Sequence, residues 1–277
     1  MHRSIDVDEQ VPIEPVARDD LIAGLQKLGL HTGDKVLAHT SLSSLGLVEG
    51  GAHTIIEALL TVIGPQGTLM MAYFYPLYDG VFDYFNPPQP YTGAVPRLLR
   101  TWPGAILSAH PTHPVVALGP DARRLTEGHH RVSAVGKDSP VDRIAQAGGK
   151  VLLLGVKQWA NTTIHTGEAY ARPPYWGQPR PDRPAGRWAI LPDTPAGQKV
   201  WVPLPETPGD SAGFHKIEPL LVERGLVTFT RIGRARCRLM PGRGLVEAVV
   251  DFLRRDPAGL LCDFPDCPFC PWARRFC

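Results

Sequence analysis

Residues 150–171 read KVLLLGVKQWANTTIHTGEAYA, an apolar run followed by a segment rich in polar residues. The apolar run over 150–156 has the pattern of a strand buried on both faces, as in a parallel sheet. The segment over 161–171 predicts a helix with Asn161 as its capping residue. A buried strand followed by a loop and a helix is the unit from which α/β proteins are built. This stretch therefore predicts an α/β fold.

The same alternation extends outward along the chain in both directions. Apolar strands are predicted at 35–41, 67–74, 105–110, 114–119, 226–231 and 235–240. Helices are predicted at 15–29, 52–63, 213–224 and 242–255, and others begin at Asp121 and Ser139. Strands that alternate with helices favour a mostly parallel central sheet covered on both faces.

The segment 173–208 departs from this pattern because it contains ten prolines. Proline disrupts helices and central strands, so we predict a Pro-rich excursion over the surface. Within it, residues 188–192 and 199–204 predict a hairpin around the turn DTPAG. No repeat or flexible linker divides the rest of the chain. We expect a single domain over 1–261 and a cysteine-rich tail over 262–277.

Composition and charge argue against several classes of protein. The 277 residues are 43% apolar and 20% charged, as is typical of globular proteins. A formal net charge of +2 gives no reason to expect nucleic acid or an anionic membrane as a partner. The N-terminal residues have mixed charge, and no apolar run is long enough to cross a bilayer. These features predict a cytoplasmic protein.

Polar residues gather where the predicted strands end, and ligands of open α/β sheets bind beyond the carboxyl ends of the strands. Four such segments are HTSLSSLG (39–46), SAHPTH (108–113), GKDSP (136–140) and NTTIHTGEA (161–169), and they carry His39, His110, His113 and His165. Any one of these histidines is also explained as a hydrogen-bonded structural residue. Their common position at strand ends favours a site.

His165 and Glu168 form the sharpest local signal. Three positions apart on a helix, they lie side by side. A carboxylate beside an imidazole fixes its tautomer and raises its basicity, which suits a general base near neutral pH. Helices also supply this pair by chance, so it indicates catalysis only together with other motifs.

The serine-rich segment 39–46, followed by Gly50 and Gly51, places hydroxyl and backbone N–H groups before a helix. Such groups suit a pyrophosphate, and an N-cap followed by a serine-rich turn is the other interpretation. The segment matches neither a Walker loop nor G-x-G-x-x-G. No G-x-S-x-G nucleophile elbow occurs in the chain, which argues against an α/β-hydrolase.

Taken in order, these motifs resemble those of the aminoglycoside 3-N-acetyltransferase family. The match comprises H-T-S-L-S-S-L-G, G-x-x-G-T-L-M-M, S-x-H-P-x-H, D-S-P, and K-V-L-L-L-G followed by N-T-T-x-H-x-x-E. It extends from about residue 15 to about residue 260. The resemblance implies a three-layer α/β/α sandwich. It also implies direct transfer of an acetyl group from acetyl-CoA to an amine, the 3-amino group of an aminoglycoside, without an acyl-enzyme.

The resemblance further implies roles for particular residues. Glu168 orients His165, and His165 acts as the general base. His110 is not expected to be essential. The residues expected to contact acetyl-CoA are His39, Thr40, Ser41, Ser43, Ser44, Ser108, Thr112 and His113.

A polycationic acceptor requires several carboxylates around its cleft. Asp79 and Asp83 follow a predicted strand, although a solvated loop also explains them. Further candidates are Asp138, Glu168 and Asp210. The residues expected to contact the acceptor are Tyr73, Asp79, Asp83 and Asn161.

Two other functions stay open from the sequence. One is a biosynthetic acyltransferase that acts on a different, non-antibiotic amine. The other is a catalytically silent protein that binds coenzyme A or an antibiotic. The presence of both His165 and Glu168 favours an enzyme. The expected partners are a small-molecule amine and coenzyme A, with the chain as a monomer or homodimer.

The tail carries four of the five cysteines, with the spacing C-x₄-C-x₂-C-x₆-C. Its C-x₂-C pair is the usual chelating unit of a zinc site, so Cys262, Cys267 and Cys270 are candidate ligands of a structural zinc ion. Cys277 is a poor candidate because chain ends fray. An ordered tail with reduced thiols, packed on the body through its aromatic residues, is the alternative.

Overall fold

A computed structural model of the chain describes residues 14–76, 80–179, 184–204 and 209–277. Asp79, one of the expected acceptor residues, lies outside these ranges. The strands are β1 (Lys35–Thr40), β2 (Thr68–Ala72), β3 (Phe82–Asp83), β4 (Ile106–Leu107), β5 (Val115–Leu118), β6 (Lys150–Leu154), β7 (Gly186–Ile190), β8 (Val200–Pro203), β9 (Thr228–Ile232) and β10 (Ala235–Pro241).

The helices occupy the segments between these strands and the end of the chain. The α-helices are α1 (Arg18–Leu28), α2 (Leu42–Leu45), α3 (Gly51–Ile63), α4 (Ala94–Leu99), α5 (Ala122–Thr126), α6 (Pro140–Gln146), α7 (Thr163–Ala171), α8 (Glu218–Glu223), α9 (Gly242–Arg255) and α10 (Cys270–Ala273). Short 3₁₀ turns are η1 (His129–Arg131), η2 (Gln158–Ala160), η3 (Phe214–Ile217) and η4 (Arg274–Phe276).

The central sheet has seven strands in the order β4-β5-β2-β1-β6-β10-β9, and it is mixed. Only β2–β1 and β1–β6 pair in parallel, whereas β4–β5, β5–β2, β6–β10 and β10–β9 are antiparallel. The expectation of a mostly parallel sheet was therefore wrong. The connections over 108–114 and 233–234 are too short for the crossover of a dozen or more residues that a parallel pair needs.

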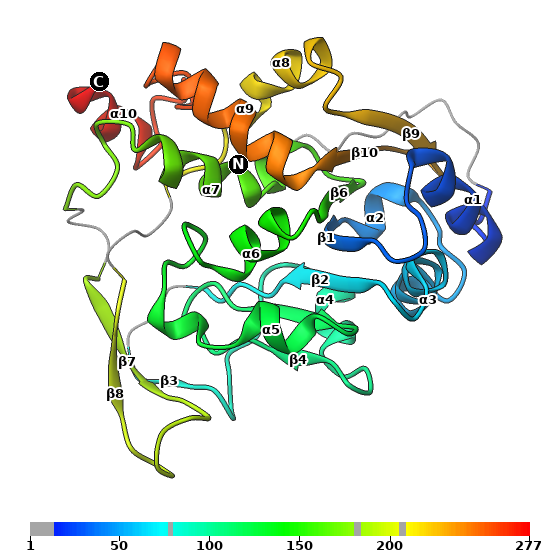
Figure 1. Cartoon of the computed structure of the whole chain (residues 1–277), viewed down its shortest axis with the longest axis horizontal. Coiled ribbons are helices and arrows are strands. Elements are labelled where there is room, and N and C mark those ends of the chain that lie inside the picture. The colour runs from blue at the N-terminus through cyan, green and yellow to red at the C-terminus, as the bar shows by residue number, and fades with distance from the viewer. Residues whose placement is uncertain (1–13, 77–79, 180–183, 205–208) are drawn as a thin grey trace.

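Helices pack on both faces of this sheet because successive strand residues point to opposite sides. Val36 and Leu152 belong to the apolar core formed with α1 and α3. On the other face, Leu37 packs with α5 and α6, while Leu153 packs with α7 and α9. Figure 1 shows α1, α2 and α3 together at one end of the sheet. The parallel strands are thus buried on both sides, as their apolar sequences predict.

The Pro-rich segment supplies two strands of a second, three-stranded sheet in the order β3-β7-β8. Its β7–β8 hairpin, which projects from the body at the lower left of Figure 1, pairs Trp188 with Trp201. This pairing confirms the predicted hairpin. Strand β3 adds to its edge in parallel, through Phe82 and Asp83.

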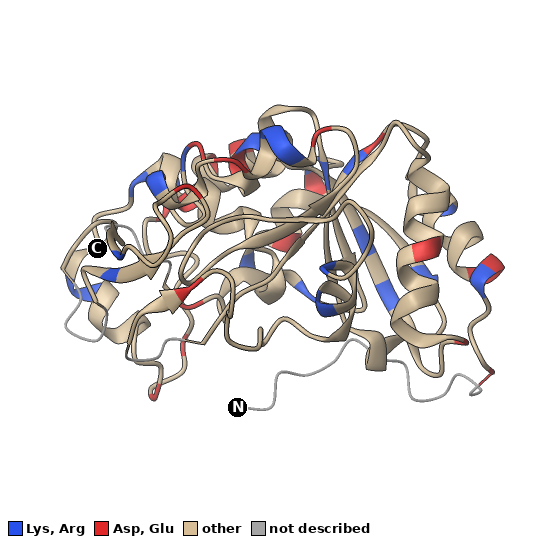
Figure 2. Cartoon of the chain, turned by 90° about the horizontal axis from the view of Figure 1, so that it is seen from below, with Lys and Arg blue, Asp and Glu red and all other residues tan. Residues whose placement is uncertain are grey.

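Basic and acidic side chains are interspersed along the elements rather than gathered on separate ones (Figure 2). Among the helices that the structure describes, none is both long and apolar enough to span a membrane.

Candidate active site

A cavity of about 1000 Å³ opens at the carboxyl ends of β1, β2 and β6. Its walls come from residues 38–43 at the end of β1 and just beyond it, from Ala72, Phe74 and Tyr75 at the end of β2, and from Val156 and residues 159–162 after β6. His165 of α7 faces it as well. The cavity therefore lies where strand ends of an α/β sheet place ligands. Its volume is in the range of small-molecule sites.

His165 and Glu168 lie on one face of α7, as their spacing predicts. His165 Nδ1 lies 2.6 Å from Glu168 Oε2, and both side chains are almost fully buried. The Tyr175 hydroxyl donates to the other carboxylate oxygen, Oε1, at 2.9 Å. Because Nδ1–H is engaged by the carboxylate, Nε2 is the ring nitrogen left to accept a proton on the cavity side.

The start of α7 is fixed by Asn161, which is fully buried and lines the cavity. Its Oδ1 accepts from the Thr163 amide at 3.2 Å, and its Nδ2 donates to Gln158 Oε1 at 2.8 Å. Helix α7 nevertheless begins at Thr163, with Thr162 in the N-cap position and no side-chain capping bond, so Asn161 stabilises the turn before the helix and is not the cap that the sequence predicts. The His165 ring also packs edge-on against Phe214, with ring centroids 4.6 Å apart. Together these contacts fix the position of α7 and of the His165 side chain beside the cavity.

The serine-rich turn after β1 presents two of its three predicted serines to the cavity, Ser41 and Ser43. Ser44 is fully buried, and its hydroxyl donates to Ser41 Oγ at 2.6 Å. Thr40 also lines the cavity. Ser44 thus orients a neighbouring hydroxyl rather than facing the cavity itself.

His39 is buried at the end of β1 and lines the cavity. Burial lowers its pKa to about 4, so its ring is neutral at pH 7. Its Nε2 is buried and has no hydrogen-bond partner among the described residues. Buried polar atoms are nearly always paired, so this nitrogen is suited to a ligand that enters the cavity.

Of the remaining residues expected to contact acetyl-CoA, only His113 lines the cavity. Thr112 is buried behind it, with its Oγ1 2.7 Å from His113 Nδ1. Ser108 is also buried, and its Oγ lies 2.8 Å from His129 Nδ1 while accepting from the Val115 amide. Ser108 and Thr112 therefore support the wall of the cavity from behind.

The residues expected to contact the acceptor are spread more widely. Tyr73 packs in the core at the edge of the Tyr75 ring, and Tyr75, two residues further along, lines the cavity instead. The Asp83 carboxylate accepts from the Phe85 amide and from Asn86, away from the cavity. Asp79 lies outside the described residues, and of the other three only Asn161 lines the cavity.

Several cavity residues lie outside the predicted set. Tyr91 and Trp159 contribute aromatic surface, and Asp210 contributes a carboxylate. Asp210 was only a secondary acceptor candidate in the sequence. Pro268 and Phe269 show that the cysteine-rich tail reaches the cavity wall. Tyr91 and Trp159 lie in segments without a recognisable motif, so the sequence held no signal for them.

Comparison with known proteins identifies relatives along nearly the whole chain. The family model for aminoglycoside 3-N-acetyltransferase matches residues 37–254. Aminoglycoside N(3)-acetyltransferase III of Acinetobacter baumannii is 33% identical over 86% of this chain and 91% of its own. Aminoglycoside N(3)-acetyltransferase VIII of Streptomyces fradiae is 35% identical over 70% of this chain and 74% of its own.

Solved structures show the same relationship. The apoenzyme of aminoglycoside acetyltransferase AAC(3)-IVa superposes with a TM-score of 0.82 at 31% identity, covering 97% of this chain and 100% of that one. A histidine-to-alanine variant of that enzyme, in complex with a gentamicin, superposes with a TM-score of 0.83 over the same shares of both chains. The sequence match, the fold and the ordered motifs agree. This chain belongs to the aminoglycoside 3-N-acetyltransferase family.

Proposed function

We propose that this chain transfers an acetyl group from acetyl-CoA to the 3-amino group of an aminoglycoside, directly and with His165 as the general base. The observation that carries the proposal is the His165–Glu168–Tyr175 arrangement beside a cavity of about 1000 Å³. Relatives with this activity in their names, and a solved relative in complex with a gentamicin, support the choice of acceptor.

The base in this mechanism is the neutral imidazole of His165. Glu168 holds Nδ1–H, so Nε2 keeps the lone pair that serves as the base. The acceptor reacts as its neutral amine: the bond from nitrogen to the thioester carbonyl carbon forms, and Nε2 takes the proton that this nitrogen loses. The C–S bond breaks, and the coenzyme A thiolate recovers that proton from His165. A positioned base of this kind contributes about 10²–10⁴-fold to the rate.

Acetyl-CoA supplies the activated acetyl group, and the residues after β1 are suited to hold it. Ser41 and Ser43 offer hydroxyls, Thr40 and His113 line the same wall, and His39 Nε2 is an unpaired buried nitrogen. Behind this wall, Ser44 hydrogen-bonds to Ser41 and Thr112 contacts His113. Ser108 is buried behind the same wall. For the acceptor we assign Asn161, together with the ring faces of Tyr91 and Trp159, which attract ammonium groups.

We further propose that residues 1–261 form one acetyltransferase domain of the three-layer α/β/α type, with 262–277 as an appended tail. Reduced cysteines and the need for acetyl-CoA support a cytoplasmic location. The second candidate is a biosynthetic acyltransferase that acts on another amine. The aromatic residues of the cavity attract ammonium groups in general and do not distinguish an antibiotic from another amine.

The proposal is tested by measuring thiol release from acetyl-CoA across aminoglycosides and simple amines. The variant is His165→Ala, and the matched control is His31→Ala, which removes an exposed histidine. Turnover with aminoglycosides that falls by about 10²–10⁴-fold in His165→Ala supports the proposal, provided that coenzyme A still binds. Turnover with other amines only would assign a biosynthetic role. Failure of the folded wild type to bind coenzyme A at all would refute an acetyltransferase.

A further inference from the structure

We propose that Cys262, Cys267, Cys270 and Asp210 bind a single zinc ion, which pins the C-terminal tail to the wall of the active-site cavity. The three cysteines come from the tail, whereas Asp210 comes from the loop that follows the Pro-rich segment. The aspartate completes a set of four ligands that the tail alone does not supply. The site is argued from its own geometry and does not depend on the reaction.

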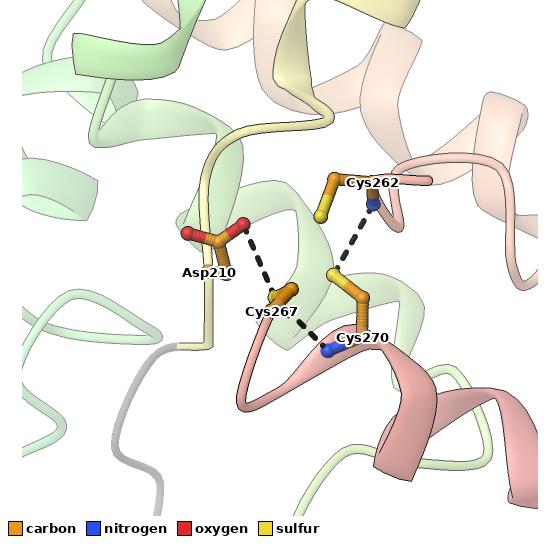
Figure 3. Close-up of side chains that lie close together, drawn as sticks. All are labelled: Asp210, Cys262, Cys267 and Cys270. Atoms are coloured by element: carbon orange, nitrogen blue, oxygen red, sulfur yellow. Dashed lines mark hydrogen bonds between the residues drawn. The ribbon is translucent and has the colours of Figure 1, made fainter. Parts of the chain in front are cut away.

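The four side chains converge on one point (Figure 3). Their ligand atoms, three Sγ and one carboxylate oxygen, all lie within 4.8 Å of one another. Tetrahedral zinc with Zn–S bonds of about 2.3 Å places neighbouring sulfur atoms about 3.8 Å apart. The observed spacing thus needs only small side-chain movements to close around one ion, and thiolates with one carboxylate are a ligand set that zinc accepts.

The backbone around the cluster is already arranged to stabilise thiolate ligands. The Cys262 amide donates to Cys270 Sγ at 3.2 Å, and the Cys270 amide donates to Cys267 Sγ at 3.3 Å. The Cys267 thiol lies 3.6 Å from Asp210 Oδ2. Such N–H···S contacts orient the ligands of a metal site and stabilise their negative charge.

Without an ion, this cluster is an unfavourable place for its own groups. The three thiols are nearly or fully buried. A zinc ion would deprotonate them and replace weak thiol contacts by coordination bonds.

Two cations sit where they can offset the charge of the loaded site. Three thiolates and one carboxylate against Zn²⁺ leave two negative charges in excess. Lys216 Nζ donates to the Leu261 carbonyl at 2.7 Å, and Arg274 donates to the Cys262 carbonyl at 2.9 Å. Both cations also pair with Asp263, next to Cys262 in the chain.

Cys277 does not belong to the cluster. It is exposed at the end of the chain, and its thiol lies 3.8 Å from the Ala273 carbonyl. The fourth position falls to Asp210, so all four ligands are protein side chains. A closed set of this kind is characteristic of structural zinc rather than of a catalytic metal with an open position.

The cluster joins two segments that both line the active-site cavity, residues 209–211 and 268–269. Gly209 packs so tightly on the Phe269 ring that a β-carbon there would clash with it. The other side of Phe269 contacts Tyr175, with ring centroids 5.7 Å apart. Because Tyr175 holds Glu168, zinc binding would stabilise the wall beside the catalytic pair.

The first test is the zinc content of the reduced, full-length protein by elemental analysis. We expect about one zinc per chain in the wild type, and its loss in Cys267→Ser. Cys277→Ser is the matched control and should keep the metal. In Asp210→Asn we expect the affinity for zinc to be weaker by at least about 10–100-fold. Losses of this size are found even for residues that only hydrogen-bond to the ligands of a metal. Asp266→Asn, which alters an exposed carboxylate of the tail outside the cluster, should bind normally.

A second measurement stays decisive if the serine variant fails to fold. Cobalt added to the metal-depleted wild type should give thiolate charge-transfer bands and the visible bands of tetrahedral Co²⁺. Chelator should lower the melting temperature of the wild type, and zinc should restore it. A folded wild type with neither zinc nor a cobalt spectrum would overturn the site. So would a disulfide among these cysteines in the intact mass, and unchanged zinc affinity in Asp210→Asn would remove the aspartate from it.

Discussion

The Tyr175 hydroxyl donates a hydrogen bond to Glu168 Oε1 across 2.9 Å, while Glu168 Oε2 engages His165. Both carboxylate oxygens are thus held, one by the base and one by the start of the Pro-rich segment. Burial and the neighbouring carboxylate raise the pKa of Tyr175, so its hydroxyl stays protonated and keeps donating at any working pH. The Pro-rich segment therefore completes the orientation of the catalytic pair.

Removing this donor should affect catalysis through Glu168. In Tyr175→Phe the buried carboxylate loses one hydrogen bond to a charged group, worth about 1.5–3 kcal/mol, and Glu168 holds the His165 ring less firmly. We expect kcat to fall about tenfold with KM little changed, which steady-state kinetics would measure.

The matched control for this prediction is Tyr170→Phe. Tyr170 lies on α7 and donates to Asp142 at 3.0 Å, away from the cavity. Its variant should leave kcat unchanged. An unchanged kcat in Tyr175→Phe as well would reduce Tyr175 to a packing residue.

His39 should show opposite effects on stability and on binding. In His39→Leu the unpaired, buried Nε2 is replaced by apolar atoms, which removes a desolvation cost of about 1–3 kcal/mol. We therefore expect an unchanged or higher melting temperature, together with a KM for acetyl-CoA that rises about tenfold, equivalent to about 1.4 kcal/mol. Calorimetry and steady-state kinetics measure the two effects. An unaltered KM would exclude His39 from the cosubstrate site.

The centre of the fold and the contact between His165 and Glu168 could be predicted because their signals are local. The apolar pattern at 150–156 and the spacing of His165 and Glu168 depend on neighbours in the chain, and both appear in the structure as expected. The outer strands were misjudged because strand direction depends on connection length. The hairpin at 233–234 cannot return a strand in parallel.

Residues that meet only through tertiary structure could not be predicted. Asp210 and Cys267 are far apart in sequence, and no spacing rule links them. Tyr73 and Tyr75 lie on the same side of an extended chain, so the two-residue periodicity of a strand could not show which of them contacts the cavity. The cavity begins where the sheet ends, and Tyr75 lies further along the chain from that end than Tyr73. Ser108 looked like a cavity residue, but its hydroxyl is taken by His129.

Gly167 should matter because α7 packs directly on α9 at this point. A β-carbon at Gly167 would clash with the Val249 side chain. Alanine gains up to about 1 kcal/mol of helix propensity, but overpacking against a branched side chain costs about 1–3 kcal/mol. We expect Gly167→Ala to lower stability and, by shifting the helix that carries His165, to lower kcat about tenfold.

The control is the double variant Gly167→Ala with Val249→Gly, which removes the obstructing β-carbon together with its methyl groups. Because the two sites are in contact, their effects should not add, and kcat should recover relative to the single variant. Unfolding in urea and steady-state kinetics supply both readouts. Equal kcat values for the single and double variants would show that the clash does not displace His165.

Stability should fall in mild acid because of His129. Its Nε2 lies 3.0 Å from the Ala134 carbonyl and its Nδ1 2.8 Å from Ser108 Oγ, so the neutral ring donates from Nε2 and accepts at Nδ1. Burial lowers its pKa to about 3, against about 6.5 in the unfolded chain. Between about pH 3 and about pH 6.5, the unfolded chain therefore binds a proton at His129 that the folded protein does not bind. The stabilisation is complete above pH 6.5 and is lost as the pH falls toward about 3, by about 1.4 kcal/mol per pH unit.

Urea unfolding between about pH 5 and pH 7 measures this slope. In His129→Gln, which keeps a donor but cannot take up a proton, the slope should be smaller by up to one proton, about 1.4 kcal/mol per pH unit. His39 and His110 also have pKa values lowered by burial, so a residual slope should persist in the variant. His31→Gln, at an exposed site, should leave the wild-type slope unchanged. Equal slopes in the wild type and in His129→Gln would mean that His129 takes up its proton in the folded protein as readily as in the unfolded chain.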